Sequence, residues 1–377
     1  MTLIAKPKLI AIDNSILGKV SKDFYSKNLE NQTKALDFFN SIKSQGLVPL
    51  FCFHHIAEIL QHENENIVSD KLSLIANFPQ VAWVKSISQN LSIGSIIDIQ
   101  GAEIKKVISS PSLSLRELIE TIRDELITYS TGSDFIEMIG PECYVIREMN
   151  LIDIQKGKAV DSISHVRDPD IDKVKLSVLK KSRLKTNDEV LGSFETLKNK
   201  YLSELHERGD RKLEGHDRIV SSFLHDVWGF GEKLHKQSGN SLYINFLNTL
   251  GIDKKYVNEN WTVGELGYFA IFKEKLKVIS RSLSLNEEDV LKYPLSTFPS
   301  WHIWVELDKR IRKEKYAHGS NIIDKYLGAF SLYADILVVD KRIKEYFKQI
   351  IRREDKFSLL KGKIIKSSDY SKMPRNL

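Results

Sequence analysis

The segment from Ser320 to Arg342 constrains the fold of this chain most strongly. Its first part has the spacing of an amphipathic helix over about 321–334, and its second part is the wholly apolar run Ile336–Val339, which stops at Asp340. A short apolar run of this kind is typical of a strand that is buried on both faces of a parallel sheet. We therefore expect a helix that leads directly into a central strand.

Three aspartates in this segment are placed by the rise of the helix and the strand. A helix rises ~1.5 Å and a strand ~3.3 Å per residue, so the chain descends about 16 Å from Asp324 to Asp335 and climbs back about as far to Asp340. Asp324 and Asp340 should meet at the carboxyl edge of the sheet, where α/β proteins bind ligands. Asp335 should lie at the opposite end, as a turn residue.

The first ninety residues alternate between strand and helix patterns. The apolar run Lys8–Ile12 ends at Asp13, Leu47–Phe53 leads into a helix that carries Glu58 in its first turns, and Val81–Val84 is a third candidate strand. This alternation indicates a parallel α/β sheet. Four acidic residues should then meet at one edge of one sheet: Asp13, Glu58, Asp324 and Asp340.

The pattern from about 93 to 289 is almost entirely helical. Ser114 and Glu117 form a capping box that opens a helix over 115–129, and Pro169 begins a basic helix. Further helices are expected over 187–207, 215–236, 263–280 and 301–315. We predict a discontinuous α/β core, residues 1–92 and 300–377, that is interrupted by a helical insertion, residues 93–299.

Composition narrows the class of protein only a little. No apolar run approaches the length of about 18 residues that a membrane-spanning helix needs, so no membrane partner is expected. The N-terminus lacks a secretory layout, which favours a cytoplasmic location. The two cysteines, Cys52 and Cys143, are too few for a disulfide framework or a zinc site. Cys52 lies within an apolar run and is expected to be a small core residue.

The distribution of positive charge is more informative than the net charge of +6. Residues 173–185 contain no acid, and the chain after Asp340 is also rich in Lys and Arg. Such patches suit a polyanionic partner, although a solvated helix face explains each of them about equally well. The basic residues of the first patch are Lys173, Lys175, Lys180, Lys181, Arg183 and Lys185.

Four carboxylates at one edge would repel one another and raise each other's pKa values. A divalent cation relieves that repulsion, and a set of oxygen ligands selects Mg²⁺ or Mn²⁺ over zinc. Such ions can generate hydroxide from water and neutralise the charge on a phosphodiester during its displacement.

The order of these motifs resembles the PIN-like nuclease family, metal-dependent ribonucleases related to flap endonucleases. The resemblance rests on Ile12-Asp13, on Glu58 within Ile56-Ala57-Glu58-Ile59-Leu60, and on Asp324 followed by a strand that ends in Asp340-Lys341-Arg342. It implies a three-layer α/β/α fold, a Mg²⁺ or Mn²⁺ cofactor, and hydrolysis of phosphodiester bonds, usually in RNA. In an endoribonuclease of this kind the four acids would hold the metal and carry catalysis. The expected contacts to nucleic acid are Lys180, Lys181, Arg183, Lys341, Arg342 and His318.

Several alternatives remain open from the sequence. Relatives usually have Ser or Thr before the last acid, where this chain has Val339, which leaves the number of bound metals open. The substrate could be DNA, or the chain could be a catalytically silent scaffold whose insertion binds a partner protein or a second copy. A role as an effector in stress or antiviral defence is an association only. Each acid could also be a cap or surface residue, and His54 and His55 are expected to be packed or hydrogen-bonded.

Overall fold

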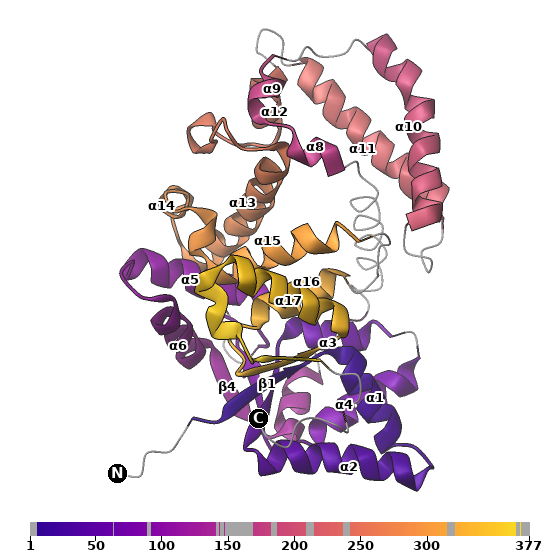
Figure 1. The fold of residues 1–377 in the computed structure, drawn as a ribbon, viewed down its shortest axis with the longest axis vertical. Helices are drawn as coiled ribbons and strands as arrows, with labels where there is room; N and C mark the ends of the chain where they lie inside the picture. Colours follow the sequence, from indigo (N-terminus) through magenta and orange to yellow (C-terminus); the bar gives the residue numbers. More distant parts are fainter. Residues whose placement is uncertain are drawn as a thin grey trace. The chain divides into compact units, whose positions relative to one another are not determined.

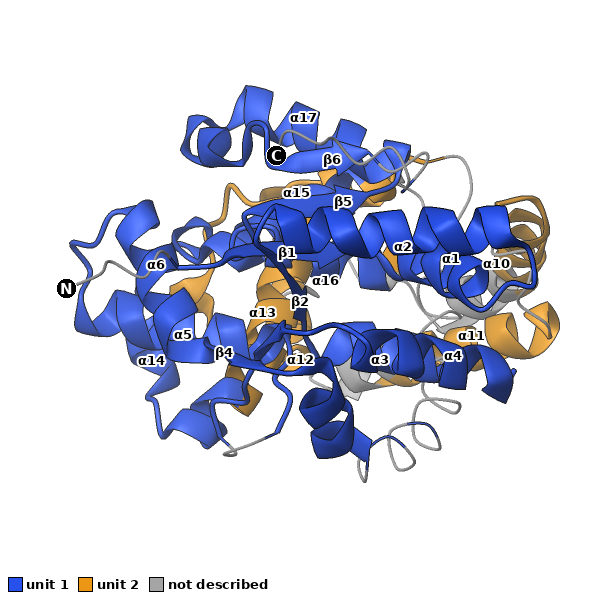
Figure 2. Ribbon diagram, turned by 90° about the horizontal axis from the view of Figure 1, so that it is seen from below, with its two compact units in different colours: residues 1–153, 279–310, 322–377 blue, residues 154–278, 311–321 orange. Residues whose placement is uncertain are grey.

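The computed structural model divides the chain into two compact units (Figure 2). Unit 1 comprises residues 1–153, 279–310 and 322–377, and unit 2 comprises residues 154–278 and 311–321. The structure describes residues 6–62, 64–88, 92–140, 143, 147, 169–181, 187–208, 215–236, 242–314, 321–366 and 370. These boundaries differ from the insertion predicted over 93–299, because residues 93–153 and 279–299 fall in unit 1.

Unit 1 is built on a six-stranded sheet in the order β4-β3-β2-β1-β5-β6. All neighbouring strands in it run parallel except β3 and β4, which are antiparallel. The fold is therefore mixed α/β with a mostly parallel sheet, as the alternating pattern predicts. The strands are β1 (Lys8–Ile12), β2 (Leu47–Phe51), β3 (Val81–Val84), β4 (Ile127–Ser130), β5 (Ile336–Val339) and β6 (Ile364–Lys366).

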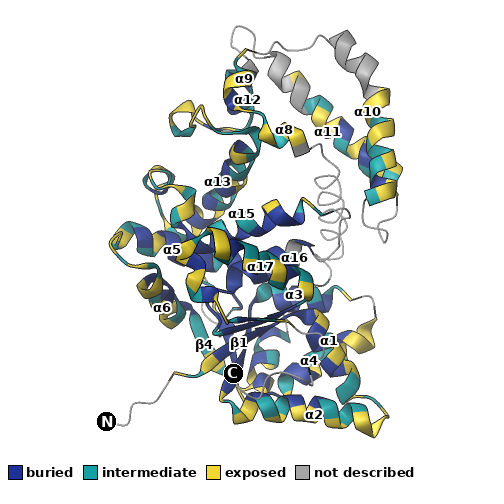
Figure 3. Ribbon diagram, in the orientation of Figure 1, coloured by how far each residue is buried: buried dark blue, intermediate teal, exposed yellow. Residues whose placement is uncertain are grey.

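The central strands are buried on both faces, as their unbroken apolar runs require. Every residue of β2, β3 and β5 is buried, and so is all of β1 after Lys8 (Figure 3). The bounds of β1, β3 and β5 are those predicted from the sequence, whereas β2 ends two residues early because Phe53 begins the next helix. Cys52, between that strand and helix, is buried, as expected.

The edge strand β4 corrects the helix predicted over 115–129. Ser114 and Glu117 do form the expected capping box, but the helix ends at Leu126 and the chain continues as β4. Thr128 and Tyr129, which are β-branched and aromatic, suit a strand, and they pair with Trp83 and Ala82 of β3. Helical periodicity alone did not indicate this change.

The helices that follow the first strands pack against one face of the sheet. Their apolar side chains form one cluster with Ile10 and Ile12 of β1 and with Ile336 and Val338 of β5. Residues 132–140 are also helical, and Phe135 packs into this cluster. These helices are α1 (Asn14–Phe24), α2 (Leu29–Ser44), α3 (Phe53–Leu60) and α4 (Glu65–Ala76).

Three helices near the C-terminus pack together around Gly328, on the opposite side of the sheet from α2 and α4 (Figure 1). A Cβ atom at Gly328 would lie 1.9 Å from Cδ1 of Leu307 and 3.5 Å from Cζ of Phe347, so a larger residue there would require the Leu307 side chain to move. The helices involved are α15 (Pro299–Ile311), α16 (Asn321–Phe330) and α17 (Lys341–Arg353). The remaining helices that lie wholly in unit 1 are α5 (Ile96–Ser109), α6 (Leu115–Leu126), α14 (Glu287–Val290), and the 3₁₀ helices η2 (Leu295–Thr297) and η3 (Asp355–Leu360).

Helix α16 ends at Phe330, four residues before the predicted end at 334. The backbone N–H groups of Ser331 and Tyr333 donate to Gly328 and Phe330, which closes the helix in tight turns. The hydroxyl of Tyr333 is held by the buried carboxylate of Glu103, 2.5 Å away. Strand β5 still begins at Ile336, so the earlier end of the helix leaves the predicted position of Asp340 unchanged.

Unit 2 is helical in the residues that the structure describes. Its two longest helices pack through Leu205, Val220 and Leu224, and the basic helix predicted after Pro169 is instead two short helices. No helix of the described residues has the length and apolar character needed to cross a membrane. The elements are α8 (Pro169–Lys173), α9 (Leu176–Leu179), α10 (Asn187–Arg208), α11 (His216–Lys236), α12 (Leu242–Thr249), η1 (Lys254–Tyr256) and α13 (Val263–Leu283), of which α13 continues into unit 1.

Candidate functional site

The carboxyl edge of the sheet in unit 1 carries the candidate site. Asp13 follows β1 and Asp340 follows β5, and these two strands are neighbours in register Ile12↔Val338. The backbone N–H of Asp13 donates to the carbonyl of Val338 at 3.1 Å. Because neighbouring strands are about 4.8 Å apart, the two aspartates leave the same edge side by side.

Asp13 and Glu58 form one half of the site. Asp13 caps α1, and its Oδ1 accepts a hydrogen bond of 2.6 Å from the N–H of Ser15. The next residue, Asn14, donates from Nδ2 to Glu58 Oε2 at 2.7 Å and to the carbonyl of His55 at 2.9 Å. Burial raises the pKa of Glu58 to about 7, the hydrogen bond from Asn14 opposes this rise, and the charge of Asp13 adds to it.

Two residues at this half of the site were missed by the sequence analysis. Asn14 is buried, and its Oδ1 has no hydrogen-bond partner among the residues that the structure describes. Lys71, from α4, packs its Cε over Gly18 and interacts electrostatically with Glu58 and Asp13; burial lowers its pKa and those two acids oppose the shift. Asn14 could have been noticed because it follows Asp13 directly, whereas nothing in the pattern around Lys71 indicates where its side chain ends.

Asp324 and Asp340 form the other half, with Arg342 between them. Nη2 of Arg342 pairs with the buried carboxylate of Asp324, and Nε of Arg342 lies 3.7 Å from Oδ2 of Asp340. Asp340 also caps α17 by accepting from the N–H of Ile343 at 2.8 Å. The predicted meeting of Asp324 and Asp340 is therefore confirmed. Arg342, which the sequence analysis expects to contact nucleic acid, is paired with both of these acids.

The site therefore consists of two acidic pairs, each with its own cation. Lys71 accompanies Asp13 and Glu58, and Arg342 accompanies Asp324 and Asp340. Within the described residues, no three His, Cys, Asp or Glu side chains are grouped so that they could hold a metal ion. The predicted four-acid cluster is thus not assembled as one metal centre. Mg²⁺ and Mn²⁺ nevertheless prefer hard oxygen donors. Such donors are present here in the carboxylates of Asp13 and Glu58 and in Oδ1 of Asn14.

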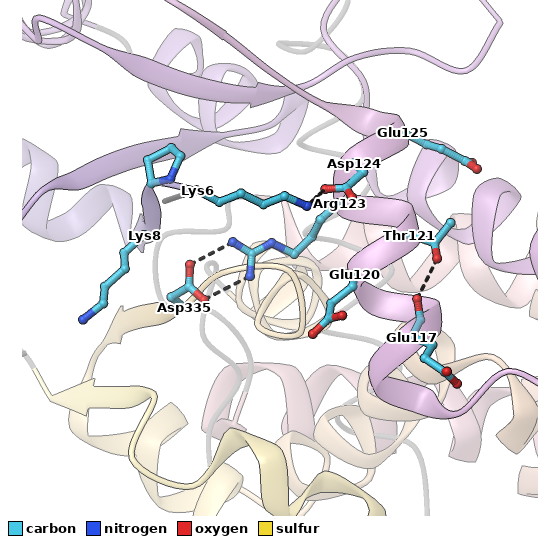
Figure 4. A pocket seen from close by; sticks show the side chains of 10 residues that line it. Lys6, Lys8, Glu117, Glu120, Thr121, Arg123, Asp124, Glu125 and Asp335 are labelled. Carbon is cyan, nitrogen blue, oxygen red and sulfur yellow. Dashed lines mark hydrogen bonds and ion pairs between the residues drawn. The ribbon is translucent and has the colours of Figure 1, made fainter. Parts of the chain in front are cut away.

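Asp335 lies at the opposite end of the sheet, as predicted. Its carboxylate accepts two hydrogen bonds from Arg123, of 3.0 and 2.8 Å, and a third of 2.8 Å from the N–H of Leu9. Burial alone would raise the pKa of Asp335, but these hydrogen bonds hold it below its usual value. Figure 4 shows the Arg123 guanidinium facing Asp335 in a surface pocket of about 800 Å³, where Lys6 likewise pairs with Asp124.

The basic patch of residues 173–185 is partly neutralised in the folded unit 2. Lys180 pairs with Glu259 and lies over the ring of Tyr243, and Lys173 pairs with Asp170 at 2.7 Å. A segment without acids in sequence thus acquires them from elsewhere in the chain. Lys181 and, in unit 1, Lys341 are exposed, whereas Arg183, Lys185 and His318 lie outside the described residues.

The two histidines beside Glu58 are packed or hydrogen-bonded, as expected. Nδ1 of the buried His55 accepts from the backbone N–H of Cys52 at 3.1 Å, and burial lowers the pKa of His55 to about 4. The ring of His54 stacks on Tyr326 with centroids 4.2 Å apart. Burial raises the pKa of the Cys52 thiol to about 12, which makes it a poor nucleophile.

Comparisons of the chain with protein-family models, with curated proteins and with solved structures gave no match. What the site can do chemically is therefore inferred from its own residues.

Proposed function

We propose that this chain is a PIN-like endoribonuclease that depends on Mg²⁺ or Mn²⁺. The observation that supports this most is the convergence of four acids from distant parts of the sequence on the carboxyl edge of one mostly parallel sheet. A sheet whose central strands are buried on both faces is also compatible with the three-layer fold of the PIN-like family.

In this proposal the oxygen donors of Asp13, Glu58 and Asn14 would hold the ion, with Asp324 and Asp340 completing the acidic edge. A bound divalent ion would supply an activated water and would offset charge on the scissile phosphate. The residues of the chain position these groups: the cap on α1 fixes Asp13, and the amide of Asn14 orients Glu58. Lys71 and Arg342 bring positive charge to the edge where a phosphate would approach.

RNA is the proposed substrate because of the family resemblance, and DNA is the alternative to be tested beside it. The experiment uses the purified full chain with end-labelled single-stranded RNA and DNA of matched sequence. We expect RNA cleavage in Mg²⁺ or Mn²⁺, no cleavage in EDTA, and no cleavage by Asp340→Asn in any buffer. The control variant is Asp335→Asn, an equal chemical change at the other end of the same strand.

Cleavage that persists in EDTA would exclude the metal-dependent mechanism. Cleavage of DNA alone would keep the fold and the chemistry but change the substrate.

A catalytically silent scaffold is the second candidate, and the Arg342 bridge between Asp324 and Asp340 favours it. An arginine that pairs with two of the four acids offsets their negative charge and so stabilises the edge without a bound ion. If the folded chain cleaves neither RNA nor DNA at any concentration of Mn²⁺, the scaffold becomes the better explanation. A search for a protein that binds unit 2 would then follow.

A further inference from the structure

The position of Arg342 bears on how many ions the site can hold. Its guanidinium is bonded to Asp324 through Nη2 and lies near Asp340 through Nε. A guanidinium remains protonated at any pH a folded protein tolerates, so this half of the site carries a permanent cation. Only 21% of the Arg342 side chain is exposed, and the side chain of Asp324 is almost fully buried.

The backbone around Arg342 keeps this cation in place. Arg342 is the second residue of α17, and Asp340 caps that helix through its Oδ1. The same aspartate thus fixes the start of the helix with one oxygen and faces the arginine with the other. Binding an ion between Asp324 and Asp340 would require displacing a paired, largely buried guanidinium.

The other half of the site differs in one decisive respect. In the described part of the chain, Oδ1 of Asn14 is buried without a hydrogen-bond partner, although Nδ2 of the same amide is bonded to Glu58 and to the His55 carbonyl. A buried oxygen without a partner costs free energy that a bound cation or water recovers. The lysine at this half, Lys71, reaches in from a separate helix, and no ion pair within 4 Å joins it to Asp13 or Glu58 in the described part of the chain.

We propose that the site holds a single divalent ion, bound by Asp13, Glu58 and Oδ1 of Asn14, and that Arg342 takes the place of a second ion at Asp324 and Asp340. This inference rests on the proposed nuclease function and specifies its metal content. A substrate would then contact one exchangeable cation, the divalent ion, and one fixed cation, the guanidinium of Arg342.

The test counts bound Mn²⁺ directly, by equilibrium dialysis of the purified chain with electron paramagnetic resonance of the free ion. We expect one Mn²⁺ per chain. Asp13→Asn should weaken that binding by at least tenfold, whereas Asp340→Asn should retain it. Asparagine caps a helix nearly as well as aspartate, so both variants should fold, which circular dichroism checks.

A second pair of variants examines the arginine itself. Arg342→Met should let a second Mn²⁺ bind between Asp324 and Asp340, whereas Arg342→Lys should keep the stoichiometry at one. Lys341→Met is the matched control, because it removes an adjacent, exposed positive charge from the same helix. It should leave the stoichiometry at one.

Two ions in the unaltered chain would overturn the inference about Arg342 and leave the nuclease proposal standing. A single ion that is lost in Asp340→Asn but kept in Asp13→Asn would also overturn it, and so would a folded Arg342→Met that still binds only one. No bound Mn²⁺ at all would contradict both this inference and the metal-dependent function.

Discussion

The two ends of the sheet in unit 1 differ in how their carboxylates are paired. At the amino end, Asp335 accepts two hydrogen bonds from Arg123 and one from the backbone N–H of Leu9, so both oxygens of its carboxylate are hydrogen-bonded. At the carboxyl end, the described residues place Lys71 near Asp13 and Glu58 and Arg342 near Asp324 and Asp340, and they offer the buried amide oxygen of Asn14 no hydrogen-bond partner. A carboxylate that is fully paired, as Asp335 is with Arg123, stabilises the fold. A carboxyl group whose pKa is raised by burial, as that of Glu58 is, and a buried polar atom without a partner among the described residues are typical of candidate binding sites.

The largest expected effect is a difference in RNA cleavage between variants at the two ends of the sheet. Asp13→Asn should lower RNA cleavage by more than about a hundredfold, because even outer-shell partners of a metal contribute 10–100-fold. Asp335→Asn should leave the cleavage rate close to that of the unaltered chain. Both variants are assayed at equal folded concentration, verified by circular dichroism. A folded Asp335→Asn that is as inactive as Asp13→Asn would show that the amino end also takes part in catalysis.

The next effect concerns Glu103, a buried carboxylate whose hydrogen-bond partners among the described residues are uncharged. It accepts hydrogen bonds from Tyr333 and Ser300, and burial raises its pKa to about 7 in spite of them. Because the folded pKa lies above the unfolded value, stability from protonated Glu103 is present below about pH 4.5 and is lost as the pH rises through about 7. A rise from 4.5 to about 7 corresponds to roughly 3–4 kcal/mol at about 1.4 kcal/mol per pKa unit.

Urea unfolding of the unaltered chain and of Glu103→Gln from pH 4.5 to 8 measures this loss. The free energy of unfolding of the unaltered chain should fall relative to the variant by an amount approaching that value. A constant difference across the range would show that the hydrogen bonds keep Glu103 ionised throughout, as Arg123 does for Asp335.

A smaller effect compares two ion pairs at the amino end. Asp335→Asn should lower the free energy of unfolding by about 2 kcal/mol, since it weakens largely buried hydrogen bonds to a charged group. Asp124→Asn removes the partner of Lys6 in a pair whose side chains are 56% and 73% exposed, and should cost less than about 1 kcal/mol. Urea unfolding at pH 7 measures both, and equal losses would contradict the role assigned to burial.

The smallest effect applies the same contrast to two adjacent lysines of unit 2. Lys181 is exposed, whereas Lys180 is already paired with Glu259. If this patch contacts RNA, Lys181→Gln should reduce the slope of log affinity against log salt by about one unit. Lys180→Gln should reduce it less. Fluorescence anisotropy with a labelled RNA in EDTA measures binding without cleavage, and an unchanged slope in both variants would identify an ordinary solvated surface.

The part of the fold that could be predicted from the sequence is the part that local pattern determines. Strands β1, β3 and β5 are apolar runs that can only be buried, and the rise per residue then places Asp340 beside Asp324 and Asp335 away from them. Strand β4 was missed because the helical period of α6 continues into Ile127 without a Gly or Pro to mark the change.

The details of the site were beyond prediction because they depend on where long side chains end. Nothing near Lys71 in the sequence shows that it reaches Asp13 and Glu58. Arg342 was assigned to nucleic acid because it lies in a basic segment, and its pairing with Asp324 and Asp340 was not foreseen. The pairing of Lys180 with Glu259 joins residues that are far apart in sequence. Distances of this kind are set by tertiary packing.

The pairing of β1 with β5 has a consequence for how the chain is made. Asp335 bonds to Leu9 across 326 positions of sequence, and ribosomes add roughly 5–20 residues per second. The edge of β1 that pairs with β5 therefore has no partner strand for tens of seconds. An unpaired strand edge can form incorrect pairings and favours chaperone binding. Asp13 and Glu58 are made early, but Asp324, Asp340 and Arg342 arrive only with the last strands. A ribosome-bound chain thus lacks half of its acidic edge until synthesis has passed Arg342.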